Sequence, residues 1–272
     1  MNETEVKEST TGRFPGQTFE TYQAIDATNA STLRALYLTT PAHVITQRET
    51  TDAMEFGAAL HCMVLEPSQF LNKYYLHRKF NRTKNVDKAE DDKLAADNPG
   101  KTGVVESDFQ AMQRIADKLR THPLSGPLIE KSSHEETLVW EESHGLCKAR
   151  VDMIGADWIG DLKTTKCAHP IDFSWVVRQS RREYGNLWIQ AAWYFRGATA
   201  LGLPVKDFHF VAIESAAPHC ISVHTLEAAE LESVQDELTR LAVQWRECVT
   251  ANNFHGYAAV RNIISLGDSD NA

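Results

Sequence analysis

Residues 149–165 read ARVDMIGADWIGDLKTT, which contains two short apolar runs separated by a turn sequence. Val, Ile and Trp are enriched in strands, so we expect one strand over residues 146–154 and another over residues 158–163. Residues 155–157, Gly-Ala-Asp, lie between the runs and are typical of a turn. The stretch therefore predicts two neighbouring strands joined by a short connection.

This arrangement gathers two carboxylates and a lysine. Asp152 and Asp161 are nine residues apart, and a hairpin can place them at the same end of a sheet. Asp161 and Lys163 are two residues apart and so share one strand face. Paired carboxylates can hold Mg²⁺, which activates a bound water and offsets phosphate charge, and Lys163 can orient or deprotonate that water. The backbone carbonyl of Leu162 is a less obvious additional ligand.

Apolar spacing, capping residues and prolines predict further elements on both sides of these strands. One helix begins near Asn29 and ends by Pro41, and the other expected helices are residues 52–65, 109–119, 183–201 and 226–252. The other expected strands are residues 137–140, 208–214 and 221–224. Residues 81–103 are charged, which indicates a mobile or inserted loop with a short helix. The order predicts an α/β fold, with a small mixed sheet flanked by helices.

The domain organisation follows from where the periodic segments begin and end. We expect a flexible arm over residues 1–25, a single domain over residues 26–265 and a flexible tail over residues 266–272. Within the domain, residues 26–130 form a helical N-terminal part and residues 131–265 the catalytic core.

Composition narrows the function classes. The chain has 272 residues, of which 42% are hydrophobic and 24% charged, as in ordinary globular proteins. No apolar run is long enough to span a membrane, the N-terminus lacks a signal sequence and no phosphate-binding P-loop occurs, so we expect a cytoplasmic protein without an ATP motor. The five cysteines form no CxxC pair, which argues against zinc or iron–sulfur sites. A net charge of −9 opposes nucleic-acid binding on average, but binding depends on the local field.

Three further segments give the sequence a specific resemblance. RVD followed by DLKTT is similar to the core of the PD-(D/E)xK nuclease superfamily, in particular its exonuclease VIII (RecE-type), lambda-exonuclease-like branch. AMEFGAALHCMVLEPSQF (53–70), STLRALYLTTPAHV (31–44) and YGNLWIQAAWY (184–194) resemble helices of that branch, in the same order. The resemblance implies an α/β nuclease core that digests linear double-stranded DNA from 5′ to 3′ without ATP and leaves a 3′ single strand.

The resemblance also implies roles for individual residues. Metal binding is expected of His61, Asp152, Asp161 and the Leu162 carbonyl, with one or two Mg²⁺ ions and Mn²⁺ as a possible substitute. Catalytic roles are expected of Asp152, Asp161, Lys163, Gln190, Tyr194 and one of Glu135 or Glu136, between which the register leaves the choice open. An acidic residue between His61 and the core contributes in some relatives, and its candidates here are Glu90, Asp91, Asp92 and Asp97.

The same resemblance implies binding partners. Double-stranded DNA ends are the expected substrate, and Arg34, Arg178, Arg181 and Arg182 are candidates for contacts with phosphate. The resemblance implies a ring-shaped homo-oligomer, a trimer or tetramer, that works beside a single-strand annealing protein. The alternatives are a site-specific or structure-specific endonuclease of the same superfamily and a non-catalytic DNA-binding or scaffold protein.

Overall fold

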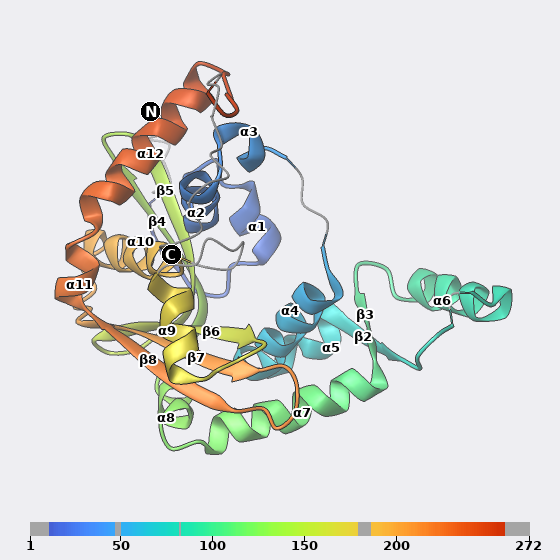
Figure 1. The fold of residues 1–272 in the computed structure, drawn as a ribbon. Helices are drawn as coiled ribbons and strands as arrows, with labels where there is room; N and C mark the ends of the chain where they lie inside the picture. The colour runs from blue at the N-terminus through green and yellow to red at the C-terminus, as the bar shows by residue number, and fades with distance from the viewer. Residues whose placement is uncertain (1–10, 47–49, 82, 179–185, 259–272) are drawn as a thin grey trace, which may run out of the picture.

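The fold is built on one six-stranded sheet, seen in a computed structural model that describes residues 11–46, 50–81, 83–178 and 186–258 (Figure 1). The strand order is β1-β4-β5-β6-β7-β8. Only β6 and β7 run parallel, and the other neighbours are antiparallel. The strands are β1 (Gly12–Phe14), β4 (Ser133–Glu142), β5 (Gly145–Ile154), β6 (Trp158–Thr165), β7 (Asp207–Glu214) and β8 (Ile221–Glu227). The predicted α/β fold with a small mixed sheet is confirmed.

The sheet splits between β5 and β6. These two strands pair only at Met153↔Gly160 and Ile154↔Ile159, whereas β6 pairs with β7 along its whole length. The turn between them requires glycine at position 155, because a Cβ there would lie 2.1 Å from the indole of Trp158. Because the pairing of β5 and β6 ends at Gly160, the two strands diverge beyond that residue, and polar side chains can enter the space between them.

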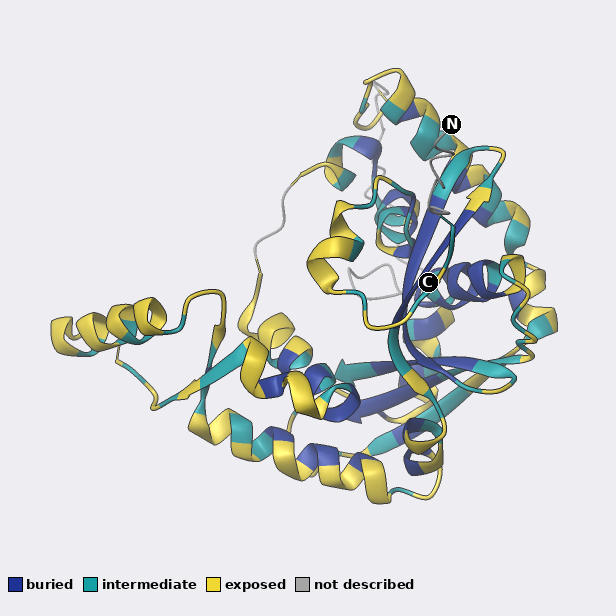
Figure 2. Cartoon of the chain, turned by 180° about the vertical axis from the view of Figure 1, so that it is seen from behind, coloured by how far each residue is buried: buried dark blue, intermediate teal, exposed yellow. Residues whose placement is uncertain are grey.

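Helices cover both faces of the sheet and bury two cores. One core contains the inner faces of α2 (Ala30–Leu38), α9 (Pro170–Arg178), α10 (Trp188–Ala200) and α12 (Gln235–Thr250). The other is formed with α4 (Asp52–Leu65), α7 (Glu106–Thr121) and α8 (Ser125–Glu130). Leu162 belongs to the second core, so its neighbours Asp161 and Lys163 point to the opposite face of β6. Figure 2 shows the burial concentrated in β4, β5 and α10.

Several helices lie close to their predicted positions. Helix α4 has the predicted bounds, with Thr51 as its N-cap, and α2 begins after the Asn29 cap. Residues 226–252 were expected to form one helix. In the structure β8 continues to Glu227, and two helices follow, α11 (Ala228–Glu232) and α12. Helix α10 is described from Trp188 onward, so the predicted start near residue 183 lies outside the described residues. None of the helices among the described residues is long and apolar enough to cross a membrane.

Two regions contain more regular structure than the sequence suggested. The charged segment 81–103 contains the 13-residue helix α6 (Asn85–Asp97), which projects from the body of the molecule (Figures 1 and 2). Its base is the parallel pair β2 (Tyr74–His77) and β3 (Thr102–Val105). The remaining short helices are α3 (Pro41–Val44), the 3₁₀ turn η1 (Pro67–Gln69) and α5 (Phe70–Lys73). A short helix was expected within this segment, and α6 is that helix, although it buries no residue.

The N-terminal segment, residues 12–25, lies on the sheet rather than forming a flexible arm. Its first residues form β1, which pairs with β4, and α1 (Phe19–Ala24) follows. The ammonium of Lys148 donates to the carbonyls of Tyr22 at 2.8 Å and Ile25 at 2.7 Å. The expectation of an arm over residues 1–25 is therefore wrong for residues 12–25, because these polar contacts and a three-residue strand hold them without an apolar pattern.

Candidate active site and metal centre

Asp152 occupies the gap where β5 and β6 diverge. Its Oδ2 atom accepts a hydrogen bond of 2.9 Å from the backbone N–H of Leu162. This hydrogen bond from Leu162 to the Asp152 side chain thus replaces the main-chain pairing between β5 and β6, which ends at Met153 and Gly160. Asp152 is only 8% exposed. The carboxylate is therefore held at the split of the sheet, where β6 carries Asp161 and Lys163.

Asp161 is the centre of a hydrogen-bonded group on the α10 face of β6. The Lys163 ammonium lies 2.6 Å from its Oδ2 atom, and the amide of Gln190 donates to its Oδ1 atom at 2.5 Å. Gln190 also donates to the hydroxyl of Tyr194 at 3.1 Å, one turn further along α10. The structure thus brings together all four residues that the spacing of the sequence placed on shared faces. Their roles stay predictions.

His61 approaches the same place from α4. Its Nδ1 atom lies 3.4 Å from Oδ2 of Asp152, and its side chain is 24% exposed. Burial lowers the pKa of the imidazole below its usual value, although Glu135 and Asp161 oppose that shift. The neutral ring that burial favours is the form that binds metal ions.

The structure separates Glu135 from Glu136. The pairs His134↔Met153 and Glu136↔Val151 place Glu135 opposite Asp152, and its backbone is left-handed, with φ of 53°. Arg150 binds its carboxylate at 2.7 Å. Glu136 instead points to the guanidinium of Arg13 on β1. Glu135 is therefore the member of the pair that lies at the site.

A divalent cation fits the group formed by His61, Glu135 and Asp152. One ligand atom from each residue lies within 4.8 Å of the other two. Burial raises the pKa of Asp152 well above its usual value, and the charges of Asp161 and Glu135 raise it further. The carboxylates of Glu135, Asp152 and Asp161 thus face only two cationic side chains, Arg150 and Lys163, and oxygen-rich sites of this kind suit Mg²⁺ or Mn²⁺. Asp161 lies beside this group, and its predicted role as a metal ligand stays a prediction.

Other predicted residues lie at various distances from this group. The candidates Glu90, Asp91, Asp92 and Asp97 are on α6, which projects away from the sheet, so they do not complete the site (Figure 1). Arg34 is half-buried on α2, and Arg178 is exposed at the end of α9. Arg181 and Arg182 lie outside the described residues. The roles of these arginines and of the Leu162 carbonyl stay predictions.

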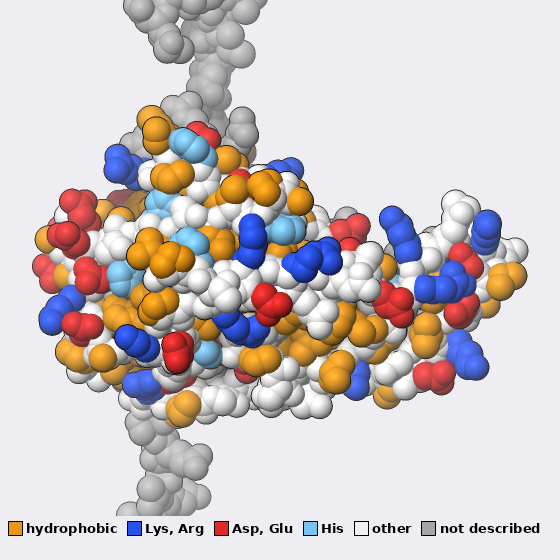
Figure 3. All heavy atoms as spheres, turned by 90° about the horizontal axis from the view of Figure 1, so that it is seen from below, with side chains coloured by type: hydrophobic (Ala, Val, Ile, Leu, Met, Phe, Trp, Pro, Cys, Tyr) orange, Lys and Arg blue, Asp and Glu red, His pale blue; other side chains and the backbone are white. Residues whose placement is uncertain are grey.

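Basic side chains form no separate field on the face shown in Figure 3, where Lys and Arg alternate with acidic and apolar side chains. A groove of about 650 Å³ lies between α4, α5 and α7. Its lining includes Met63, Phe70 and Arg120 and none of the residues around Asp152. Neither this groove nor the face in Figure 3 marks the site, which is identified by its carboxylates.

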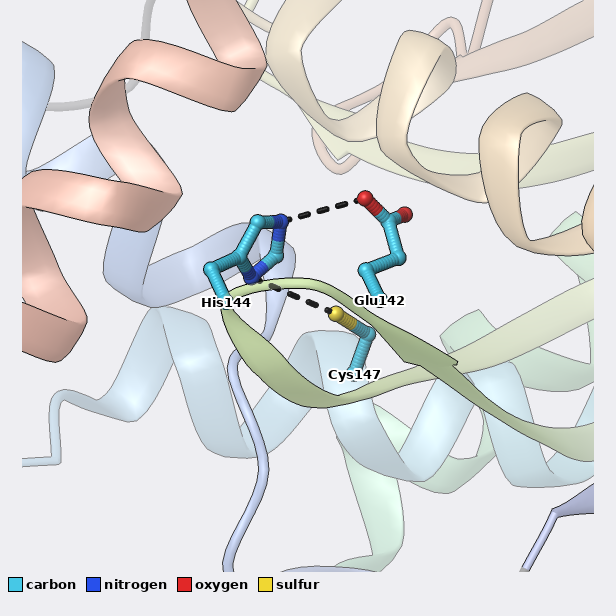
Figure 4. A group of neighbouring side chains, drawn as sticks. All are labelled: Glu142, His144 and Cys147. Carbon is cyan, nitrogen blue, oxygen red and sulfur yellow. Dashed lines mark hydrogen bonds and ion pairs between the residues drawn. The ribbon is translucent and has the colours of Figure 1, made fainter.

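A second group of possible ligands lies at the turn between β4 and β5 and contains Glu142, His144 and Cys147 (Figure 4). Glu142 lies 3.1 Å from the Nε2 atom of His144, whereas the sulfur of Cys147 lies 4.0 Å from Nδ1. The two contacts thus involve different nitrogens of the imidazole ring, and one ion cannot bind both of these nitrogens. Burial also raises the pKa of Cys147 to about 12 when no metal ion is bound.

Glu142 already has a cationic partner. The guanidinium of Arg196 binds both carboxylate oxygens, with Nε 2.6 Å from Oε1, and the indole of Trp140 donates to the same atom at 2.7 Å. In this structure the second group is a partly buried ion pair of Glu142 and Arg196 with adjoining side chains.

Comparisons with known proteins agree with the fold. Residues 21–259 match the family described as a PDDEXK-like domain of unknown function (DUF3799). The crystal structure of a "Putative exonuclease" from Eubacterium rectale is similar, with a TM-score of 0.61 and 14% identity over 92% of this chain and 96% of that chain. No curated protein matches the chain. The chain belongs to the PDDEXK-like family.

Proposed function

We propose that this protein is a metal-dependent nuclease that hydrolyses phosphodiester bonds in DNA. The observation that carries the proposal is the meeting of His61, Glu135 and Asp152 with the Asp161–Lys163 pair at the split of the sheet. Family membership supports the chemistry, and the solved structure described as a "Putative exonuclease" supports the class of nuclease.

The residues around the split have distinct tasks in this proposal. His61, Glu135 and Asp152 would hold Mg²⁺ or Mn²⁺, which activates water and offsets phosphate charge when bound. Lys163 presents its ammonium beside Asp161, where it orients the attacking water and compensates the charge that develops on the phosphate. Gln190 holds the carboxylate of Asp161, and Tyr194 in turn accepts a hydrogen bond from Gln190.

The finer proposal concerns the form of DNA. We infer that the enzyme digests linear double-stranded DNA from 5′ to 3′ without ATP and leaves a 3′ single strand. The resemblance of residues 31–44, 53–70 and 184–194 to the exonuclease VIII branch supports this, and so does the name of the solved neighbour. The same resemblance supports a trimeric or tetrameric ring and a single-strand annealing protein as partner. An endonuclease of this superfamily and a non-catalytic scaffold are the competing assignments.

The test compares one DNA molecule in linear and in covalently closed circular form, with Mg²⁺ and without ATP. Asp161→Ala is the test variant, and Asp172→Ala, an acidic residue on α9 with a 67% exposed side chain, is the control. We expect wild type and the control to digest only the linear form, and Asp161→Ala or EDTA to stop digestion. Cutting of the circle would favour the endonuclease. No cutting by a folded protein that binds DNA would favour the scaffold.

Direction and assembly need separate measurements. Linear DNA with phosphorothioate linkages at only the 5′ ends should resist digestion, whereas the same linkages at only the 3′ ends should have little effect at first. The opposite result would reverse the proposed polarity. Light scattering of the full chain should give the mass of three or four subunits, and a monomer would contradict the ring.

A further inference from the structure

Arg150 connects the candidate metal centre with the N-terminal segment. It lies on β5 two residues before Asp152, and its side chain is 10% exposed. Its Nε atom donates to Oε2 of Glu135 at 2.7 Å, and its Nη1 atom donates to the backbone carbonyl of Gln17 at 2.7 Å. The guanidinium thus bridges a candidate metal ligand and a carbonyl of the segment just before α1.

Glu135 is a residue that needs such support. Its left-handed backbone, with φ of 53°, is uncommon for a residue other than glycine and persists where surrounding contacts hold it. Its carboxylate faces Asp152, and repulsion between the two would drive its side chain away while no cation is bound. A rigid, forked donor that is itself fixed by Gln17 opposes this movement, because the planar guanidinium binds in one orientation.

We propose that Arg150 is a positioning residue of the metal centre, which holds the Glu135 carboxylate in place with the Gln17 carbonyl as a brace. The inference rests on the proposed function, because it takes Glu135 as a ligand. It makes the N-terminal segment a part of the site: the contact from Gln17 reaches the metal ligands through a single side chain.

The neighbouring ion pair provides a matched comparison. Arg13 on β1 binds Glu136, the next residue of β4, on the side away from the site. Both pairs join an arginine to consecutive glutamates, and both connect the N-terminal segment with β4. Only Glu135 lies with His61 and Asp152. A change at Arg13 therefore reports the effect of losing an ion pair without the effect on the metal ligand.

The experiment measures Mn²⁺ binding to the full chain by titration calorimetry in the absence of DNA. Arg150→Lys keeps the charge but loses the fork, and Arg150→Gln removes the charge. We expect both to weaken Mn²⁺ binding about 10- to 100-fold, the usual effect of removing a side chain that orients a ligand. Arg13→Lys should change it less than about twofold by the same reasoning. Thermal unfolding without metal confirms that each variant is folded.

A double variant tests whether Arg150 acts through Glu135. Glu135→Gln should weaken Mn²⁺ binding, and Arg150→Lys should cause no further loss in that background, because the carboxylate it positions is already gone. A full additional loss would overturn the inference. So would unchanged binding in Arg150→Lys together with tighter binding in Arg150→Gln, since that pattern indicates a purely electrostatic role.

The result for the metal site itself separates this inference from the proposed function. If wild type binds Mn²⁺ and Glu135→Gln weakens binding while the Arg150 variants do not, only the positioning role is overturned. If wild type binds no Mn²⁺, or if Glu135→Gln has no effect, the metal centre as assigned is overturned and the inference with it. If Arg150→Lys does not fold, Arg150→Gln is used in its place in the double variant.

Discussion

The two ends of the β4–β5 hairpin hold similar side chains but differ in their charge. At the turn, Glu142 and His144 are matched by the guanidinium of Arg196. At the open end, Glu135 and Asp152 face each other beside Asp161, with His61 as a neutral neighbour. The comparison teaches that the types of residue do not make a metal site. At the open end the three carboxylates of Glu135, Asp152 and Asp161 face two cationic side chains, Arg150 and Lys163, whereas at the turn Arg196 matches Glu142, so the open end is the better candidate for a cation.

The largest effect expected at the open end is on catalysis. Lys163→Met removes the ammonium beside Asp161 and should lower the rate of DNA cleavage about 10²- to 10⁴-fold, the usual contribution of a positioned acid or base. The free energy of unfolding should also fall, because the buried carboxylate of Asp161 loses its cationic partner. Single-turnover cleavage of linear DNA measures the rate, and an unaffected rate would remove Lys163 from the mechanism.

At the turn the largest expected effect is on stability. Arg196→Met leaves Glu142 partly buried without its guanidinium and should lower the free energy of unfolding by about 3 kcal/mol. Arg240→Met, which breaks an exposed pair with Glu237, is the matched control and should change it by less than about 1 kcal/mol. Urea unfolding in EDTA measures both. Equal losses in the two variants would mean that burial of the Glu142 pair has no special effect.

Added metal should distinguish the two ends. At a concentration about 100 times its dissociation constant, Mn²⁺ should raise the free energy of unfolding by about 2.7 kcal/mol. Asp152→Asn should abolish that gain and unfold at the same or a higher temperature without metal, because it removes a buried charge that its neighbours repel. Glu142→Gln should keep the gain. Stabilisation by Mn²⁺ that depends on Glu142 instead would reverse the assignment of the two clusters.

The smallest expected effect is a dependence on pH at the turn. Burial alone would raise the pKa of Glu142, but hydrogen bonds from Arg196 and Trp140 outweigh it and hold the pKa below the usual 4.5. The stabilisation by the ionised carboxylate is therefore complete above that value and is lost as the pH falls through the lower, folded-state pKa.

Glu142→Gln should accordingly cost on the order of 1.5 kcal/mol of unfolding free energy at pH 7 in EDTA, and less as the pH falls below 4.5. Urea unfolding of both proteins at each pH gives the difference directly. A difference that grows as the pH falls would contradict the lowered pKa.

Much of the site could be predicted from local spacing. Asp161 and Lys163 share a strand face, and Gln190 and Tyr194 share a helix face, because strand and helix periods fix these relations without tertiary contacts. Helix α4 has a Thr51 cap, an apolar side and a proline just beyond its end, and its bounds were predicted correctly. These are features that neighbouring residues determine among themselves.

Other parts were not visible in the sequence. The choice between Glu135 and Glu136 depends on a left-handed residue and on pairing with β5, which no local pattern shows. The N-terminal segment has too short a strand to give a periodic signal, yet it supplies Arg13 and the Gln17 carbonyl. The parallel strands β2 and β3 at the base of α6 are four residues each, too short to give a periodic signal.

The motifs of the sequence by themselves thus indicated the family, and local spacing determined the residue types of the site and helices such as α4, since such spacing depends on contacts within a few turns of chain. Only the tertiary structure decided which glutamate lies with His61 and Asp152, and how charge is balanced in the two similar clusters. The physical reason is that both questions concern charge balance between strands and helices distant in sequence. That balance exists only after the sheet splits between β5 and β6 and the N-terminal segment lies on its edge.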